Sequence, residues 1–185
     1  MSSGEGAFPL KSDEEAIVAL GTNVAFGGAA GAELLARAGE ALGSHGLIVR
    51  RRSSFWLSPA WPDPADPPFV NACLAAVAPG MVPAAVLGAL HAVEARFGRV
   101  RSVKNAPRTL DLDLISWGDR IISGPEGLEI PHPRLSGRAF VLAPLTEIAP
   151  DWRHPATGES VVSLLAAASD RAALQQIGPW DAGSV

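Results

Sequence analysis

Residues 108–118 read RTLDLDLISWG, an arginine followed by two aspartates that alternate with leucines. Successive side chains of a β-strand point to opposite faces of its sheet. A strand here therefore directs Asp111 and Asp113 to one face and the leucines between them to the other. Carboxylates this close repel each other, and an unpaired buried charge is costly. We therefore expect a positive group between the two aspartates.

The chain upstream of this strand shows two kinds of hydrophobic periodicity. Apolar or alternating runs predict strands, and leucines and valines at helical spacing predict helices that end in glycine. The strands are expected at 16–22, 47–57, 69–77 and 108–118, and the helices at 31–43 and 83–98. The order β-α-β-β-α-β predicts an α+β, ferredoxin-like antiparallel sheet with helices on one face. Beyond it we expect short C-terminal strands and a helix near 160–168.

The length of 185 residues suits one domain with its own core. We expect a flexible N-terminal extension at 1–15, a single domain at 16–170 and a C-terminal tail at 171–185. The start of the sequence has no signal-peptide pattern. The apolar stretch 72–90 is interrupted by prolines and a glycine, which argues against a membrane span.

Charge and cysteine content indicate the compartment and the kind of ligand. The single cysteine, Cys73, cannot form an internal disulfide, and this favours a cytoplasmic protein in which Cys73 is a small buried hydrophobe. The net charge is −4, yet residues 95–110 hold five basic side chains and no acid. A local basic segment on an acidic protein favours a compact anionic ligand over nucleic acid.

The paired aspartates and this basic segment together suggest a metal–nucleotide site. Mg²⁺ takes oxygen ligands, and it usually binds one or two carboxylates together with substrate phosphates. A nucleoside triphosphate would supply those phosphates. The alternative for the same pattern is a pair of solvent-exposed strand carboxylates beside a solvated basic loop.

A second polar cluster lies in IPHPRLSGRAFVLAPL, residues 130–145. Prolines on both sides restrict the backbone around His132. Arg134 and Arg138 follow closely, and arginine recognises phosphate through paired hydrogen bonds. The alternative is a structural histidine.

Two phenylalanines and an asparagine could form a site for a flat heterocycle. Phe69 shares a strand face with Asn71, and Phe140 follows the downstream arginines. Two rings can stack on a heterocycle while an amide reads its edge. From the residues alone, two core phenylalanines are the simpler interpretation.

These motifs resemble those of the 6-hydroxymethyl-7,8-dihydropterin pyrophosphokinase family. The matching stretches occur in the family's order: ALGTN (19–23), SSFW and SP (53–59), FVNA (69–72), Glu94 with GRVR (98–101), PRTLDLDL (107–114), IPHPR (130–134) and RAFVLAPLTEIAP (138–150). The most specific feature is PRTLDLDL with PHPR downstream.

The resemblance implies an ATP-dependent pyrophosphokinase of folate biosynthesis. Such an enzyme transfers diphosphate from ATP to the hydroxymethyl group of the pterin and releases AMP. Asp111 and Asp113 would hold two Mg²⁺ ions, and the hydroxymethyl oxygen would attack the β-phosphorus in line. ATP and the pterin would be the partners, with no nucleic acid or membrane, and a monomer is expected.

The family pattern also implies roles for individual residues. Arg99 and Arg101 correspond to arginines of the family's mobile loop. The resemblance implies that these two arginines, Asp111 and Asp113 are the catalytic residues. The residues expected to bind ATP are Glu94, Arg99, Arg101, Arg108, Leu114, Leu128, His132 and Arg138. Those expected to bind the pterin are Ser58, Pro59, Trp61, Phe69, Asn71 and Phe140.

Two alternatives stay open, and one departure from the family bears on the first. Asn105 and Ala106 stand where the family usually has Trp-Gly, so loop closure could be altered. The first alternative is a non-catalytic or altered nucleotide-binding protein of the same fold. The second is a metal-dependent nucleotidyltransferase, which would need a third carboxylate on a neighbouring strand and would release pyrophosphate. The strand segments 47–57 and 69–77 contain no carboxylate.

Overall fold

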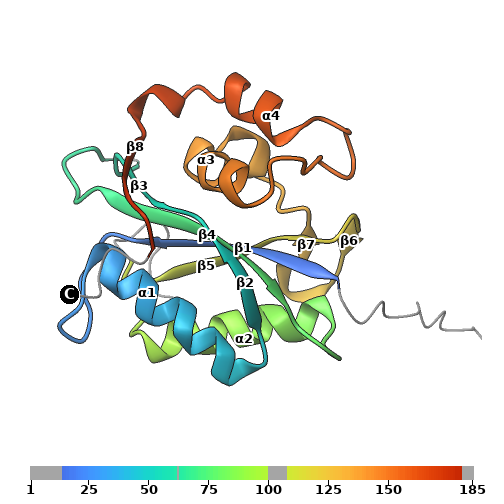
Figure 1. The fold of residues 1–185 in the computed structure, drawn as a ribbon. Coiled ribbons are helices and arrows are strands. Elements are labelled where there is room, and N and C mark those ends of the chain that lie inside the picture. Colours follow the sequence, from blue (N-terminus) through green and yellow to red (C-terminus); the bar gives the residue numbers. More distant parts are fainter. Residues whose placement is uncertain (1–13, 62, 100–107, 181–185) are drawn as a thin grey trace, which may run out of the picture.

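The computed structural model describes residues 14–61, 63–99 and 108–180. A central antiparallel sheet has helices on both faces (Figure 1). The strands are β1 (Glu15–Thr22), β2 (Ile48–Arg52), β3 (Phe55–Ser58), β4 (Phe69–Val77), β5 (Asp111–Trp117), β6 (Ile122–Ser123), β7 (Glu129–Ile130) and β8 (Gln175–Gly178). The α-helices are α1 (Gly31–Ala41), α2 (Pro83–Arg96), α3 (Ala139–Ile148) and α4 (Val161–Ala167). Short 3-10 turns cover Leu42–His45, Pro125–Gly127, Leu135–Gly137 and Arg171–Ala173.

The strand order confirms the ferredoxin-like prediction. The sheet runs β5-β1-β4-β3-β8, with β2 also paired to β4, while β6 and β7 form a separate hairpin. The first and last strands of the βαββαβ unit, β1 and β5, are therefore neighbours. Because β5 is an edge strand, its aspartates lie at the margin of the sheet.

The predicted strand 47–57 is two strands, because the chain leaves the ladder at Ser53. Ser53 N donates to Cys73 O at 3.0 Å, and Cys73 N donates to the Ser53 hydroxyl oxygen at 2.9 Å. The hydroxyl thus takes the place of a backbone acceptor. Both parts still pair with β4.

One hydrophobic core lies between the sheet and the helices α1 and α2. The leucines of the opening motif, Leu110, Leu112 and Leu114, are 0–4% exposed within it. Burying each leucine contributes about 1.5–3 kcal/mol. The alternation that the sequence predicts for β5 is confirmed.

A second core covers the other face, where α3 and α4 pack (Figure 1). The sequence predicted a helix near 160–168 but none at 139–148. Helix α3 is buried on nearly all sides between the sheet and α4, and Pro144 lies inside it. An all-round apolar helix has no amphipathic period, and an internal proline argues against a helix.

The last described strand lies in the stretch 171–185 that the sequence assigns to a tail. β8 pairs antiparallel with β3. The Trp180 ring stacks on Phe55 at 4.8 Å, and a Cβ added to Gly39 of α1 would lie 2.7 Å from the Trp180 ring. These contacts attach residues 175–180 to the sheet and to α1. The domain boundaries at 15 and 170 stay a prediction.

In the described part of the chain, no helix combines the length and the apolarity that crossing a bilayer requires. The apolar stretch 72–90 forms the end of β4, a turn and the start of α2.

Candidate active site

Asp111 lies between two arginines at the sheet margin. Its Oδ1 accepts from Arg99 Nη1 at 2.5 Å, and its Oδ2 accepts from Arg108 Nη1 at 2.7 Å. Because the leucines of β5 face α1 and α2, the aspartates point to the face on which α3 packs. The side chain of Asp111 keeps 24% of its surface exposed, so a ligand can reach it.

Asp113 has two other partners, both from the segment before α3. Arg138 Nη1 lies 3.3 Å from Asp113 Oδ2, and His132 Nε2 lies 3.9 Å from the same oxygen. Each aspartate therefore has separate partners. Arginine side chains thus lie beside each aspartate, whereas a positive group between the two carboxylates stays a prediction.

Burial lowers the pKa of His132 below its usual value, although the Asp113 carboxylate opposes this shift. Its Nδ1 accepts from Arg134 N at 3.2 Å, and its backbone N donates to Ile115 O at 2.9 Å. This hydrogen-bond network assigns the neutral tautomer with the proton on Nε2. His132 thus presents an N–H donor on the aspartate side. Burial also lowers the pKa of the Arg138 guanidinium, with Arg134 acting in the same direction.

Glu94 connects α2 to β5 at this margin. Its side chain is buried, and Oε1 accepts from Leu112 N at 2.8 Å and forms an ion pair with Arg99. Arg99 N also donates to Glu94 O at 3.1 Å. Arg99 therefore bridges a buried glutamate and the exposed side of Asp111. A buried carboxylate needs such partners to stay ionised.

A hollow of about 290 Å³ opens beside these groups. It brings together six residues that the sequence predicts for the site: Glu94, Arg99, Asp113, Leu114, Leu128 and His132. Its other lining residues are Leu87, His91, Leu112, Gly127, Glu129, Pro133 and Arg134. Those from the β6–β7 hairpin region were not predicted as site residues, because two-residue strands carry no periodicity. The PHPR motif was the only signal for Arg134.

A row of residues runs across the sheet from the predicted pterin site to Asp111. Trp56, Asn71, Gly21 and Asp111 are successive register partners on β3, β4, β1 and β5. A Cβ added to Gly21 would lie 3.4 Å from Asn71 Oδ1, 3.9 Å from the Phe69 ring and 4.0 Å from Asp111 Cβ. Because Gly21 has no side chain, the sheet surface between the Asn71 amide and the Asp111 carboxylate is open. We call this open surface the floor of the site.

Asn71 is fixed in orientation beside this floor. The residue is 4% exposed, and its Nδ2 donates to Ser58 Oγ at 3.0 Å. The amide nitrogen is held within the protein, so Oδ1 is the atom that faces the space at Gly21. An acceptor in this position suits the N–H groups of a heterocycle edge.

Phe140 is joined to the aspartates through Arg138. The Arg138 guanidinium carbon lies 5.6 Å from the centre of the Phe140 ring, within cation–π range. By contrast, Trp61 is 76% exposed and Pro59 is also exposed, so their part in pterin binding stays a prediction. Arg101, Asn105 and Ala106 lie outside the described residues.

Residues 17–150 match the family model described as 7,8-dihydro-6-hydroxymethylpterin-pyrophosphokinase (HPPK). The chain belongs to the HPPK family. Every site residue predicted from the sequence lies inside the stretch that matches HPPK, whereas β8 and Trp180 lie beyond it.

Two curated relatives carry the name 2-amino-4-hydroxy-6-hydroxymethyldihydropteridine pyrophosphokinase. The one from Synechocystis sp. is 44% identical over 120 residues, which cover 65% of this chain and 60% of the relative. The one from Pseudomonas aeruginosa is 46% identical over 105 residues, which cover 56% of this chain and 63% of the relative. The chain thus spans about 60% of the length of these HPPK relatives.

A crystal structure of Plasmodium falciparum HPPK-DHPS shares the fold. It superposes with a TM-score of 0.66 at 12% sequence identity, and the match covers 89% of this chain and 47% of that protein. At this identity the likeness concerns the fold alone.

Proposed function

We propose that this HPPK-family chain transfers diphosphate from ATP to 6-hydroxymethyl-7,8-dihydropterin and releases AMP. The observation that carries the proposal is the shared sheet face of Asp111 and Asn71, which are separated only by Gly21. This arrangement sets a group able to bind metal and phosphate beside a group able to read a heterocycle edge. The names and the family of the relatives agree with this activity.

The donor set at the aspartates fits Mg²⁺. No three His, Cys, Asp or Glu side chains in the described ranges gather as a metal site. Two carboxylates from the protein, with phosphate oxygens and waters completing the shell, are the usual way in which Mg²⁺ binds. We assign Asp111 and Asp113 as the ligands of two ions. When bound, these ions would neutralise the phosphates and align the attacking and leaving oxygens.

The arginines then exchange partners. Arg99 and Arg108 pair with Asp111 in the present structure. With Mg²⁺ held by Asp111, the two guanidiniums would be available for phosphate oxygens, which they could bind through two parallel hydrogen bonds. Arg138 and the Nε2–H of His132 supply further fixed donors beside Asp113. Such donors lower the barrier because they are already oriented where negative charge develops.

The pterin would lie over Gly21 with its edge on Asn71 and with Phe69 and Phe140 against its ring. Its hydroxymethyl oxygen releases its proton to solvent and forms the new bond to the β-phosphorus, while the bond between that phosphorus and the α,β-bridging oxygen breaks. AMP carries this oxygen away. Catalysis here depends on positioning and charge stabilisation, so no covalent nucleophile is required.

The decisive experiment follows all phosphorus products of a mixture of protein, MgATP and the pterin alcohol. We expect AMP and a pterin diphosphate in equal amounts by phosphorus NMR and chromatography. Asp111→Asn should abolish the reaction, whereas Asp119→Asn, an exposed aspartate just beyond β5, is the matched control. Pyrophosphate as a product would instead support a nucleotidyltransferase. Binding of both substrates without turnover would support a non-catalytic protein.

We further propose a cytoplasmic monomer that acts on these small molecules alone. The net charge of −4 and the single buried cysteine support this proposal. Light scattering after gel filtration tests the monomer directly, since a dimer would double the measured mass.

A further inference from the structure

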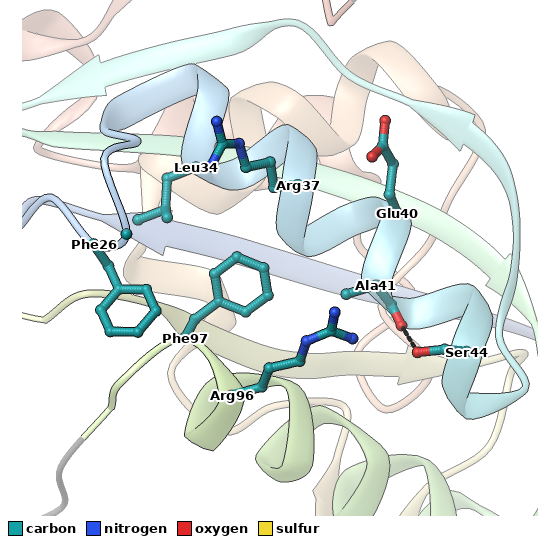
Figure 2. A pocket seen from close by; sticks show the side chains of 9 residues that line it. Phe26, Leu34, Arg37, Glu40, Ala41, Ser44, Arg96 and Phe97 are labelled. Carbon is teal, nitrogen blue, oxygen red and sulfur yellow. Dashed lines mark hydrogen bonds between the residues drawn. The ribbon is translucent and has the colours of Figure 1, made fainter.

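A second hollow lies between α1 and the C-terminal end of α2 (Figure 2). Its volume is about 520 Å³, within the range of small-molecule sites. It shares no lining residue with the hollow beside the aspartates. The residues that matter for its chemistry are Phe26, Leu34, Arg37, Glu40, Arg96 and Phe97.

The inner wall of this hollow is apolar and aromatic. Phe97 points into the space between the two helices, with Leu34 beside it (Figure 2). The rings of Phe26 and Phe97 lie 6.4 Å apart and are tilted by 48°. An aromatic ligand of one or two fused rings can stack on Phe97 or meet it edge to face.

The rim of the hollow carries a cation available for a ligand. Arg37 extends from α1 and Arg96 from α2, with Phe97 between them (Figure 2). Arg37 pairs with Glu33 at 2.7 Å. Arg96, in contrast, forms no ion pair with any carboxylate in the described part of the chain. A planar guanidinium binds a planar carboxylate through two hydrogen bonds, so Arg96 favours a carboxylate ligand.

Glu40 limits how much negative charge the ligand can carry. It lines the hollow from α1, and its carboxylate points away from Arg96 and Phe97 (Figure 2). Its negative charge at this edge of the hollow disfavours a second negative group on the ligand.

We propose that this hollow binds small aromatic carboxylates, molecules with one flat ring system and one carboxylate group. The ring lies against Phe97, and the carboxylate pairs with Arg96. The site is separate from those for ATP and the pterin.

The segment 97–99 connects this hollow to the candidate active site. The ring of Phe26 packs so closely on Gly98 that a Cβ there would lie 2.3 Å from it. Gly98 has a φ of +76°, which favours glycine. The next residue, Arg99, contacts Glu94 and Asp111. A ligand that restricts the position of Phe97 therefore also favours the position of Arg99 seen here, in contact with Asp111.

This connection predicts an inhibitory ligand, an extension that rests on the proposed function. Arg99 occupies the carboxylate of Asp111, which the proposed reaction assigns to Mg²⁺. A ligand that stabilises this arrangement opposes binding of MgATP. By thermodynamic linkage, MgATP must weaken the binding of the aromatic carboxylate by the same factor.

The binding proposal is tested with 1-naphthoate and its neutral isostere 1-naphthamide, by calorimetry or protein-observed NMR. We expect naphthoate to bind at least about tenfold more tightly than naphthamide. Arg96→Gln should remove this preference, Glu40→Gln should strengthen naphthoate binding, and Arg171→Gln on the far layer should change nothing. Absent or equal binding of the two probes, or an unchanged preference in Arg96→Gln, overturns the site. Displacement of naphthoate by the pterin would place it in the active site instead and also overturns the proposal.

The coupling is tested by the Kd for MgATP with and without saturating naphthoate, which requires no turnover. We expect at least about a threefold weaker Kd in the wild type and no change in Arg96→Gln. An unchanged Kd in the wild type overturns the coupling. A chain that binds naphthoate but shows no diphosphate transfer would contradict the proposed function alone, so the two failures are distinguishable.

Discussion

Arg99 binds Asp111 directly, with Nη1 2.5 Å from Oδ1, and the same guanidinium pairs with the buried Glu94. One arginine thus bridges two carboxylates at the sheet margin, one buried and one partly exposed. The buried pairing supports the fold. The exposed pairing occupies the group that the proposed reaction assigns to a metal ion.

Replacing either aspartate by asparagine should abolish diphosphate transfer. Asp111→Asn and Asp113→Asn each keep the size of the side chain but remove a proposed Mg²⁺ ligand and its charge. We expect kcat to fall by about a thousandfold or more, the scale of a lost transition-state contact of about 4 kcal/mol. Steady-state AMP release at several Mg²⁺ concentrations measures this effect. Turnover within tenfold of the wild type in either variant would contradict the metal assignment.

Arg99→Ala should lower stability as well as activity. The variant leaves the carboxylate of Glu94, a residue with a side chain only 2% exposed, without its guanidinium partner. We expect a loss of about 1–3 kcal/mol in the free energy of unfolding.

The double variant Arg99→Ala, Glu94→Gln separates this effect from a general loss of packing. A buried neutral amide costs less than a buried carboxylate that has lost the Arg99 guanidinium, so the double variant should be more stable than Arg99→Ala alone. Urea unfolding of the wild type and of the single and double variants gives the coupling between the two residues. Simple additivity of the two single changes would show that the ion pair does not stabilise the fold.

Gly21→Ala should weaken pterin binding selectively. The added methyl group would lie at ordinary contact distance from Asn71, Phe69 and Asp111, so the fold can accept it. It would, however, fill the floor on which the heterocycle is proposed to rest. We expect about a tenfold weaker Kd for the pterin and little change for ATP.

The matched control for Gly21→Ala is Gly88→Ala in α2, where an added Cβ meets nothing within 4 Å. This control should leave both affinities unchanged and stabilise the helix by about 0.5–1 kcal/mol. Calorimetry with each substrate distinguishes the two variants. Unchanged pterin affinity in Gly21→Ala would argue that the ring binds elsewhere.

The fold was predictable wherever a segment has one buried and one open face. β4, for example, has the bounds that the sequence predicts, and the leucines of β5 are buried as their alternation requires. Long-range contacts decide the remaining elements. The break at Ser53 depends on a hydrogen bond to Cys73, twenty residues away in the sequence. α3 is a helix because the sheet and α4 enclose it.

The same distinction between local sequence pattern and long-range contacts applies to the candidate site. The two aspartates lie in one strand motif, so the alternation of β5 placed them on one face, whereas the direct contact between Arg99 and Asp111 appears only in the structure. The role of Gly21 as a floor appears only when the register sets it between Asn71 and Asp111. Arg96 lies only three residues from Arg99, but the hollow that it shares with Phe97 needs α1 as its second wall.

Cys73 should be chemically inert in the folded protein and should make stability fall at high pH. Burial raises the pKa of its thiol far above the usual range, with the charge of Glu147 acting in the same direction. The thiol therefore stays protonated when folded but ionises in the unfolded chain above pH about 8.5. Above that pH the unfolded state binds fewer protons than the folded state, so stability falls as pH rises. Below that pH the contribution of the protonated Cys73 thiol to stability is complete. The contribution is lost as pH rises, by up to about 1.4 kcal/mol per pH unit.

Two measurements check this prediction, both referred to Cys73→Ala. Iodoacetamide at pH 9 should modify Cys73 only as fast as the protein unfolds, and rapidly in urea. Between pH 8 and 10.5, the free energy of unfolding should fall more steeply in the wild type than in Cys73→Ala. The alanine variant itself should be about 1–2 kcal/mol less stable at pH 7, since it removes a buried sulfur. Fast alkylation under native conditions, or parallel pH profiles for the two proteins, would show that the thiol is accessible and not held neutral by burial.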